Sequence, residues 1–486
     1  MATSQASKSP NKWQVFFLVA IGIFMSTLDG SIVNIAVPSI MRDFDASLAT
    51  IQWVVMIYLL TVTSLLLSFG RLSDLRGRRQ VYSLGLLCFA TGSLLCGLAG
   101  NVVWLIGSRL FQGVGAAMIM ACTPALIVDI FPATERGRAL GLVGSVVALG
   151  LSAGPALGGL VLHLLSWRAI FFINIPFGLI TAGAVFFLLK GSEADITREE
   201  TFDWPGALFL ALGLGSLLLA VTHCYDWGYA SPSIVGLFLL AGMAMLALIL
   251  IEARTHHPIL SLDLFRIRLF YLPMISSVLL FTSLFSLVFL MPFYLLRPNG
   301  LPIDQAGYIM ATNFVFLFVV SPVAGALSDR IGSRLLCAGG MGIVALALYL
   351  LGSLPPRISS LAIIWRLALV GVGTGIFIPP NSSSAMTAVP TCRRGVASGT
   401  MAGARNLGMV LGVALSGALF NSTFHRLNHG FSRKEYRPVL ESVFMASFQT
   451  AMRWAMVVAL LGMVVSYLRG TERSPDSAFR KGQVSS

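Results

Sequence analysis

Residues 70–79 read GRLSDLRGRR, and a second copy of this pattern, GALSDRIGSR, follows at residues 325–334. Gly, Leu, Ser, Asp, Gly and the final Arg coincide at identical spacing in the two copies. Each copy lies between two long apolar runs, which we interpret as the second and third helices of one half of the chain. A pattern that recurs at corresponding places indicates an internal duplication.

The composition of the chain excludes a soluble protein. Of its 486 residues, 56% are hydrophobic and 11% are charged, and the mean hydropathy is +0.84. Soluble domains carry about 25% charged residues. The net charge of +13 comes from Lys and Arg scattered between apolar runs, not from the clustered stripes that bind nucleic acid, so we expect no nucleic-acid partner. A protein embedded in a lipid bilayer is the class that fits.

Fourteen apolar runs are long enough to cross a bilayer as helices. We therefore predict an all-α integral membrane protein with two six-helix halves that are related by pseudo-symmetry. The halves occupy 1–190 and 269–470, two inserted spanning helices with their linkers occupy 191–268, and a cytoplasmic tail occupies 471–486. Lys and Arg concentrate in alternate loops, and the positive-inside rule then places both termini in the cytoplasm. The chain is expected to be a multi-pass protein of the bacterial inner (plasma) membrane.

Sequence motifs of enzymes and metal sites are missing. The six cysteines form no CxxC pair, the six histidines form no HExxH motif, and no nucleophile elbow or Walker loop occurs in a credible context. We expect no enzymatic activity, no metal and no cofactor. Duplicated six-helix halves are typical of secondary transporters. Because no ATP-binding domain is present, transport would use an ion gradient or the substrate's own gradient.

The repeated loop is interpreted as a gate between helices. Its glycines permit a tight turn, and Asp74 can pair with arginines of a neighbouring segment. The alternative is a plain cytoplasmic turn, which explains the arginines but not the recurring spacing. The residues assigned to this gating loop are Gly70, Asp74, Gly77, Arg78, Arg79 and Asp329.

The fifth span is unusually rich in glycine and contains a proline. Small residues let helices approach closely, and a proline can bend a helix. Close helix packing alone would explain part of this pattern, but the embedded proline favours a helix that bends or slides during transport. The residues concerned are Gly150, Gly154, Pro155, Gly158 and Gly159.

Asp29 is the only carboxylate deep in an apolar span, and such residues usually bind or relay ions and protons. At 1.5 Å per residue, Arg109 lies at roughly the same depth, with Gln112 on the same face of its helix. Pairing between Asp29 and Arg109 is therefore geometrically possible, and both are predicted to couple transport to protons. The alternatives are an interhelical hydrogen bond without turnover for Asp29, and satisfaction by backbone carbonyls and Gln112 for Arg109.

A central substrate cavity is expected between the first, fourth, ninth and twelfth spans. Arg405, near the middle of the thirteenth span, is added as a further candidate. The predicted cavity residues are Asn34, Gln112, Ser286, Tyr294, Arg366, Asn381 and Arg405.

At these motifs the chain resembles the major facilitator superfamily, specifically its fourteen-helix drug:proton antiporters, from about Trp13 to Leu468. Residues 70–79 resemble the superfamily's loop motif, and the fifth-span glycines resemble the antiporter motif of exporters at every spacing. Further similar segments are Leu28–Pro38, with Ser31 where Thr is usual, Arg109–Gly115, Trp53 with Tyr58–Leu60, and Trp167–Gly178. The second loop copy departs from the pattern at Ile331 and Ser333.

The resemblance implies a proton-coupled exporter of small amphipathic compounds or drugs that works by alternating access. A monomer is expected, and a periplasmic adaptor protein is kept as a candidate partner. The alternatives are an uptake symporter or uniporter, a membrane receptor that does not transport and, least favoured, a membrane-embedded enzyme. Four arginines against one aspartate within the spans favour, as a further option, an anionic or zwitterionic substrate.

Overall fold

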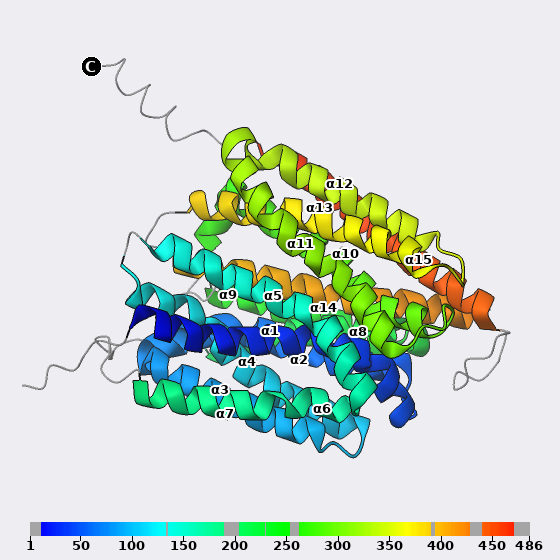
Figure 1. Ribbon diagram of the computed structural model, residues 1–486, viewed down its shortest axis with the longest axis horizontal. Coiled ribbons are helices and arrows are strands. Elements are labelled where there is room, and N and C mark those ends of the chain that lie inside the picture. The colour runs from blue at the N-terminus through cyan, green and yellow to red at the C-terminus, as the bar shows by residue number, and fades with distance from the viewer. Residues whose placement is uncertain are drawn as a thin grey trace, which may run out of the picture.

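The computed structural model shows a bundle of long helices with roughly aligned axes (Figure 1). It describes residues 11–132, 135–188, 204–228, 230–252, 262–389, 394–427 and 440–470. All regular structure in these segments is helical, as expected from the sequence. A helix satisfies its own backbone hydrogen bonds, which is required where no water can replace them.

The first part of the chain forms six spans. The last of them is built from two consecutive helices, α6 and α7, and its apolar segment is Trp167–Phe187. The helices are α1 (Lys12–Asp43), α2 (Leu48–Arg76), α3 (Arg78–Gly97), α4 (Val102–Ile130), α5 (Arg136–Leu164), α6 (Trp167–Phe172) and α7 (Asn174–Leu188).

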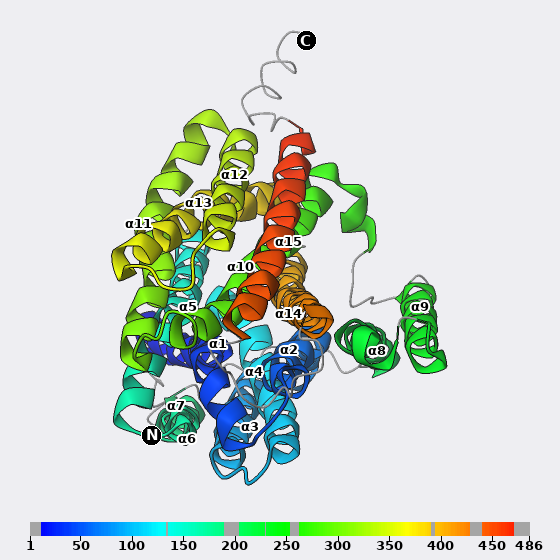
Figure 2. The ribbon, with the colours of Figure 1, turned by 90° about the vertical axis from the view of Figure 1, so that its right-hand side faces the viewer.

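Two helices follow that lie outside the main bundle, α8 (Trp204–Trp227) and α9 (Pro232–Glu252) (Figure 2). α8 packs against α2, α14 and α9, whereas α9 packs mainly against α8. Most side chains of α9 are therefore exposed on the surface of the bundle, where a purely apolar helix meets lipid.

The second part of the chain begins with a short 3₁₀ helix, η1, and then forms six spans. The 3₁₀ helix is η1 (Leu262–Arg266), and the six spans are α10 (Arg268–Leu296), α11 (Ile303–Ile331), α12 (Ser333–Gly352), α13 (Ser360–Thr387), α14 (Arg394–Leu427) and α15 (Glu441–Leu468).

The number of spans agrees with the sequence prediction. Within the described residues, 13 helical segments are long and apolar enough to cross a membrane, and α8 contributes a shorter apolar segment at Leu208–His223. Counted with α8, the spans number fourteen.

The helix contacts of the two six-span parts correspond. In the first part α1 packs on α5, α2 on α4, and α3 on both α4 and α7. In the second part α10 packs on α14, α11 on α13, and α12 on both α13 and α15. The repeated loop thus joins equivalent helices in both parts, with Gly77 (φ 90°) between α2 and α3 and Gly332 (φ 81°) between α11 and α12. A positive φ suits glycine, so the tight turn explains why glycine recurs there.

The bundle has two ends. α1 begins and α15 finishes at the end that we call the terminal face, on the left in Figure 1, where the repeated loop also lies. The other end, the opposite face, carries the α1–α2 connection.

The two six-span parts are tightly packed near the opposite face. A Cβ added to Gly159 of α5 would lie 2.9 Å from the Cα of Gly307 of α11, and one added to Gly417 of α14 would collide with Gln52 of α2. Nearer the terminal face, a Cβ on Gly144 of α5 or on Gly403 of α14 would meet no atom within 4 Å. The interface between the parts is therefore closed at the opposite face.

Candidate functional site

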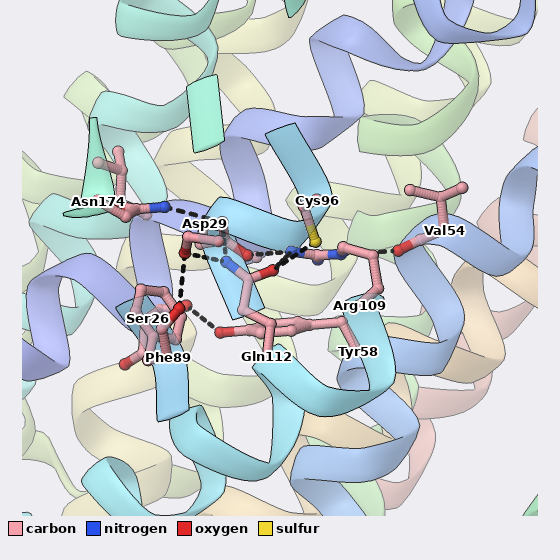
Figure 3. Close-up of polar contacts among 12 residues, drawn as sticks. Ser26, Asp29, Val54, Tyr58, Phe89, Cys96, Arg109, Gln112 and Asn174 are labelled. Atoms are coloured by element: carbon pink, nitrogen blue, oxygen red, sulfur yellow. Dashed lines mark hydrogen bonds and ion pairs between the residues drawn. The ribbon is translucent and has the colours of Figure 1, made fainter. Parts of the chain in front are cut away.

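A buried ion pair between α1 and α4 forms the centre of the first six-span part (Figure 3). Arg109 donates through a guanidinium nitrogen to the Oδ2 of Asp29, and both side chains are 0% exposed. The structure thus brings together the two residues that the sequence predicted to share one depth. Their role in proton transfer stays a prediction.

The carboxylate of Asp29 has two further partners, and each is a donor. Its Oδ1 accepts a hydrogen bond from Gln112 Nε2 at 3.0 Å and from Asn174 Nδ2 at 3.1 Å. Asn174 is the first residue of α7, so the carboxylate ties three helices together. An oxygen pair surrounded by three donors is satisfied as an ionised carboxylate.

Gln112 connects the ion pair to α3. Its Oε1 accepts from the Arg109 guanidinium at 2.6 Å, and its Nε2 also donates to Ser93 Oγ at 2.8 Å. The Cys96 thiol lies 3.6 Å from the same Oε1. The amide is therefore held in one orientation, with its oxygen toward the cation and its nitrogen toward the carboxylate.

Aromatic rings cover the guanidinium of Arg109. Its carbon lies 4.1 Å from the ring centroid of Tyr58 and 5.7 Å from that of Phe171, and its Nε donates to Val54 O at 3.0 Å. One terminal nitrogen of Arg109 is buried without a hydrogen-bond partner among the described residues. The rings compensate in part, because a cation is attracted to an aromatic face.

Tyr58 separates this pair from a cavity between the two six-span parts. Its hydroxyl donates to Ser26 O at 2.7 Å, and its side chain lines a cavity of about 20 Å³, room for about one water molecule. The cavity is lined from α1, α2, α4, α5 and α14 by Ser26, Thr27, Gly30, Tyr58, Leu59, Val62, Met120, Val147, Leu151, Arg405, Asn406 and Met409.

Of the predicted cavity residues, Arg405 lines this cavity and Gln112 belongs to the adjacent ion-pair network. Asn34 bonds back to its own helix through Gly30 O and Ser31 O. Ser286 donates to Thr282 O and to Gly412 O of α14.

The other three predicted residues also lie outside the cavity. Tyr294 donates to Pro355 O at 2.7 Å near the opposite face, and Arg366 donates to Ala362 O and stacks on Trp365. Asn381 accepts from Arg469 at 2.9 Å near the terminal face. The expected lining by the ninth and twelfth spans is replaced by α2, α5 and α14, because α2 and α14 pack directly across the interface.

The repeated loop makes an ion pair and hydrogen bonds to the ends of neighbouring helices at the terminal face. Arg78 pairs with Asp129 of α4, and Arg79 donates to Phe186 O at the end of α7. The equivalent Arg334 donates to Tyr467 O at 2.7 Å at the end of α15. A cation at the last carbonyls of a helix is favourable, which explains why the final arginine recurs. The side chains of Asp74 and Asp329 lie outside the described residues.

The glycines of the fifth span pack against α1. Cβ atoms added to Gly150 and Gly154 would lie 3.2 Å from Leu28 N and 2.8 Å from Ile32 N, and one added to Gly158 would reach Ile32. These glycines repeat every four residues and so form one face of α5, which packs against α1, the helix that carries Asp29. Gly159 faces α11 instead, and Pro155 lies inside a continuous α5.

Three residues around the ion pair were not assigned a role from the sequence: Asn174, Tyr58 and Ser93. Asn174 and Tyr58 lie in segments noted for their resemblance, but nothing in the order of residues shows that Asn174 reaches Asp29 from a sixth span. Ser93 carried no signal, since serine is common in spanning helices as a small packing residue.

The fold and the buried network define a membrane protein of duplicated six-helix parts with an ion pair beside the interface between them. The family model described as Major Facilitator Superfamily matches residues 19–294 and 273–484. The chain belongs to this superfamily, as its motifs indicated.

Several relatives cover most of the chain. It is 36% identical over 403 residues to the riboflavin transporter RibZ of Clostridioides difficile, covering 82% of this chain and 86% of that protein. It is 33% identical to the multidrug resistance protein Stp of Mycobacterium tuberculosis (83% of this chain, 75% of Stp). It is 32% identical to the multidrug transporter protein MdtP of Bacillus subtilis (78% and 70%). The resemblance to multidrug efflux members is thereby confirmed.

A solved structure supports the fold. A bacterial homologue of the human lysosomal transporter Spinster, in an inward-facing and occupied conformation, matches with a TM-score of 0.65 at 16% identity. The match covers 94% of this chain and 96% of that one.

Proposed function

We propose that this transporter is a proton-coupled secondary active exporter of small amphipathic compounds, with Asp29 and Arg109 as the coupling pair. The observation that carries the proposal is the fully buried network of Asp29, Arg109, Gln112 and Asn174 beside the cavity between the two six-span parts. Relatives named as a multidrug resistance protein and a multidrug transporter protein support export.

Protonation of Asp29 would disrupt this network. The ionised carboxylate accepts from three donors, whereas a protonated one carries its own O–H and needs an acceptor. Turning the Gln112 amide would supply that acceptor, but it would also place the amide nitrogen against the Arg109 guanidinium. The network has one arrangement that satisfies it when ionised, so proton binding favours a different arrangement of α1, α4 and α7.

Alternating access supplies the route for the proton. Asp29 is 0% exposed, and the interface is closed at the opposite face, so the pair must be opened by a rearrangement of the two six-span parts. We propose that the terminal face is cytoplasmic, in keeping with the distribution of Lys and Arg. The opposite face would then open to the outside, where Asp29 takes up its proton.

We infer that the proton gradient drives the cycle without a cofactor, that the chain resides in the bacterial inner membrane, and that it works as a monomer. A periplasmic adaptor would contact the opposite face. The chain is cross-linked in its native membrane and purified by affinity, and the recovered proteins are compared with those from the same membrane lacking the chain. A protein recovered only with the chain supports that partner.

Proteoliposomes test the coupling directly. A panel of lipophilic cations and organic anions is screened for efflux driven by an imposed pH gradient, and the best substrate is used with Asp29→Asn. We expect the substitution to abolish gradient-driven efflux, while Asp45→Asn, the same change at an exposed carboxylate of the α1–α2 connection, leaves it intact. Undiminished gradient-driven efflux with Asp29→Asn would show that the coupling assignment is wrong.

Uptake is the second candidate function, because one relative is named a riboflavin transporter, a name that does not specify export. Export and uptake can be distinguished in vesicles of known orientation, because an imposed proton gradient drives substrate accumulation in only one of the two orientations. Accumulation in everted vesicles supports export, and accumulation in right-side-out vesicles supports uptake.

A further inference from the structure

The cavity between the two six-span parts offers a positive charge that nothing in the described part of the chain neutralises. Arg405 of α14 lines the cavity and makes no hydrogen bond or ion pair with any described residue. The next residue, Asn406, is 3% exposed, and its side-chain nitrogen also lacks an acceptor within the described segments. Two neighbouring donors therefore face a cavity without a protein acceptor.

The other polar groups around the cavity are already engaged or supply no charge. Ser26 O accepts from Tyr58, and the Thr27 hydroxyl donates to Ile23 O at 2.8 Å. No Asp or Glu is among the residues that line the cavity in the described structure. The rest of the wall is apolar and polarizable, with Met120, Met409 and the Tyr58 ring as its larger members.

We propose that Arg405 and Asn406 bind the anionic group of an amphipathic substrate, so that the transported compounds are organic anions or zwitterions with a carboxylate-like group. The proposal rests on the proposed transport function and adds to it the charge of the substrate. A guanidinium offers paired N–H donors that match a carboxylate, and the neighbouring amide adds another.

Arg405 is half-buried within a spanning helix, and this position makes the assignment specific. An arginine without a partner inside a membrane protein is unfavourable and is kept where it serves a ligand or pathway. A carboxylate from the substrate would neutralise it and satisfy the Asn406 donor in the same step. At about 20 Å³ the cavity accepts only a small group in this conformation, so the apolar body of the substrate requires the two parts to separate.

The direction of transport fits an anion. With the cytoplasm negative, the membrane potential expels an anion and attracts a proton, so the exchange of one for the other is driven by the potential and by the pH gradient together. Exchange of a neutral compound for one proton moves half as much charge across the membrane as exchange of a monoanion for one proton. Efflux of a monoanion should therefore respond more steeply to an imposed potential.

Binding to the purified full-length protein tests the recognition apart from coupling. The probes are matched aromatic amphiphiles with pyrene and naphthalene bodies, each carrying a carboxylate, a carboxamide or a quaternary ammonium, and the readout is ligand-induced thermal stabilisation. We expect the carboxylates to bind most tightly. Arg405→Gln should weaken carboxylate binding about tenfold or more and change carboxamide binding by less than about threefold. Arg405→Lys should retain part of the carboxylate affinity.

The control is Arg453→Gln, the same change at an exposed arginine of α15 outside the cavity, and it should bind all probes as the wild type does. The proposal is overturned if the carboxylates bind no better than the carboxamides, if the ammonium probes bind best, or if Arg405→Gln binds the carboxylates as the wild type does. It is also overturned if chloride alone stabilises the wild type through Arg405 while the carboxylates do not.

Failure of this inference is distinguishable from failure of the proposed function. Normal carboxylate recognition with no response of efflux to a proton gradient would refute the coupling but not the substrate class. Gradient-driven efflux of the ammonium probes, unaffected by Arg405→Gln, would refute the substrate class but not the coupling.

Discussion

At the scale of single residues, the site is a group of polar side chains that bond mainly to one another inside an apolar bundle. Asp29 and Arg109 neutralise each other, and Gln112 and Asn174 complete the hydrogen bonding of the carboxylate. A buried pair of this kind contributes little net stability, but removing one partner leaves the other charge buried and unpaired. The arrangement therefore suits a group whose charge changes during a transport cycle.

A double-mutant cycle on this pair tests that reasoning. Arg109→Gln should lower the free energy of unfolding by about 3–5 kcal/mol, because it leaves the Asp29 carboxylate without its cation. Adding Asp29→Asn should recover much of the loss, since a neutral amide needs no counter-charge. Thermal unfolding of the purified protein, followed by tryptophan fluorescence, measures both. A double variant that loses as much stability as the two single variants, Arg109→Gln and Asp29→Asn, lose together would mean that the pair is not coupled.

Tyr58 allows a second test at this scale. Tyr58→Phe keeps the ring over Arg109 and removes only the hydrogen bond to Ser26 O, so we expect a loss of about 1 kcal/mol and near-normal transport. Tyr58→Ala removes the ring and opens the cavity toward the ion pair, and gradient-driven efflux should fall by at least tenfold. Equal activity of the two variants would argue against a role for the ring.

At the scale of helices, the packing of α5 on α1 determines how closely the Asp29 helix is held. Gly150, Gly154 and Gly158 form one face of α5 with little room for a side chain. The same helix contributes Gly159 to the contact with α11, so α5 touches both α1, which carries Asp29, and the other six-span part. A shift of α5 would therefore change its contacts with both α1 and α11.

Alanine substitutions along α5 check this arrangement with an internal control. Gly154→Ala places a Cβ 2.8 Å from Ile32 N, which should cost about 1–3 kcal/mol of stability and reduce transport. Gly144 lies on the same helix, and the Cβ of Gly144→Ala would meet no atom within 4 Å, so this substitution should be neutral or slightly stabilising. Melting temperatures and efflux rates of the two variants give the comparison. Equal behaviour would contradict the close α1–α5 contact.

At the scale of the whole molecule, the duplicated parts meet along α2 with α14 and α5 with α11. The close contacts of Gln52 with Gly417 and of Gly159 with Gly307 lie near the opposite face. Interfaces of this kind change by rigid-body motion of packed parts more readily than by gradual deformation. In the proposed transport cycle, the structure is the state that is closed at the opposite face.

Cross-linking tests whether this closed interface must open. In a background without other reactive thiols, Gln52→Cys combined with Gly417→Cys should form a disulfide under mild oxidation and stop transport, and a reducing agent should restore it. Each single cysteine variant is the control and should be insensitive to the oxidant. Full transport by the cross-linked protein would show that this end of the interface does not open.

The sequence by itself determined the class of protein, the number of spans and the duplication. Those properties follow from the length of apolar runs and from a motif repeated at fixed spacing, both of which are local. It also placed Asp29 and Arg109 at one depth, because a helix rises by a constant 1.5 Å per residue. Depth, however, does not specify rotation about the helix axis or the identity of the neighbouring helix.

The tertiary structure decided which residues meet. It brought Asn174 of α7 and Ser93 of α3 to the ion-pair network, and it placed Arg405 at the cavity while Asn34, Tyr294 and Arg366 took partners elsewhere. In a membrane helix the lipid-facing and buried faces are both apolar, so the periodicity that marks the inner face of a soluble helix is absent. Only the packing of α2 against α14 and of α1 against α5 resolved that rotation.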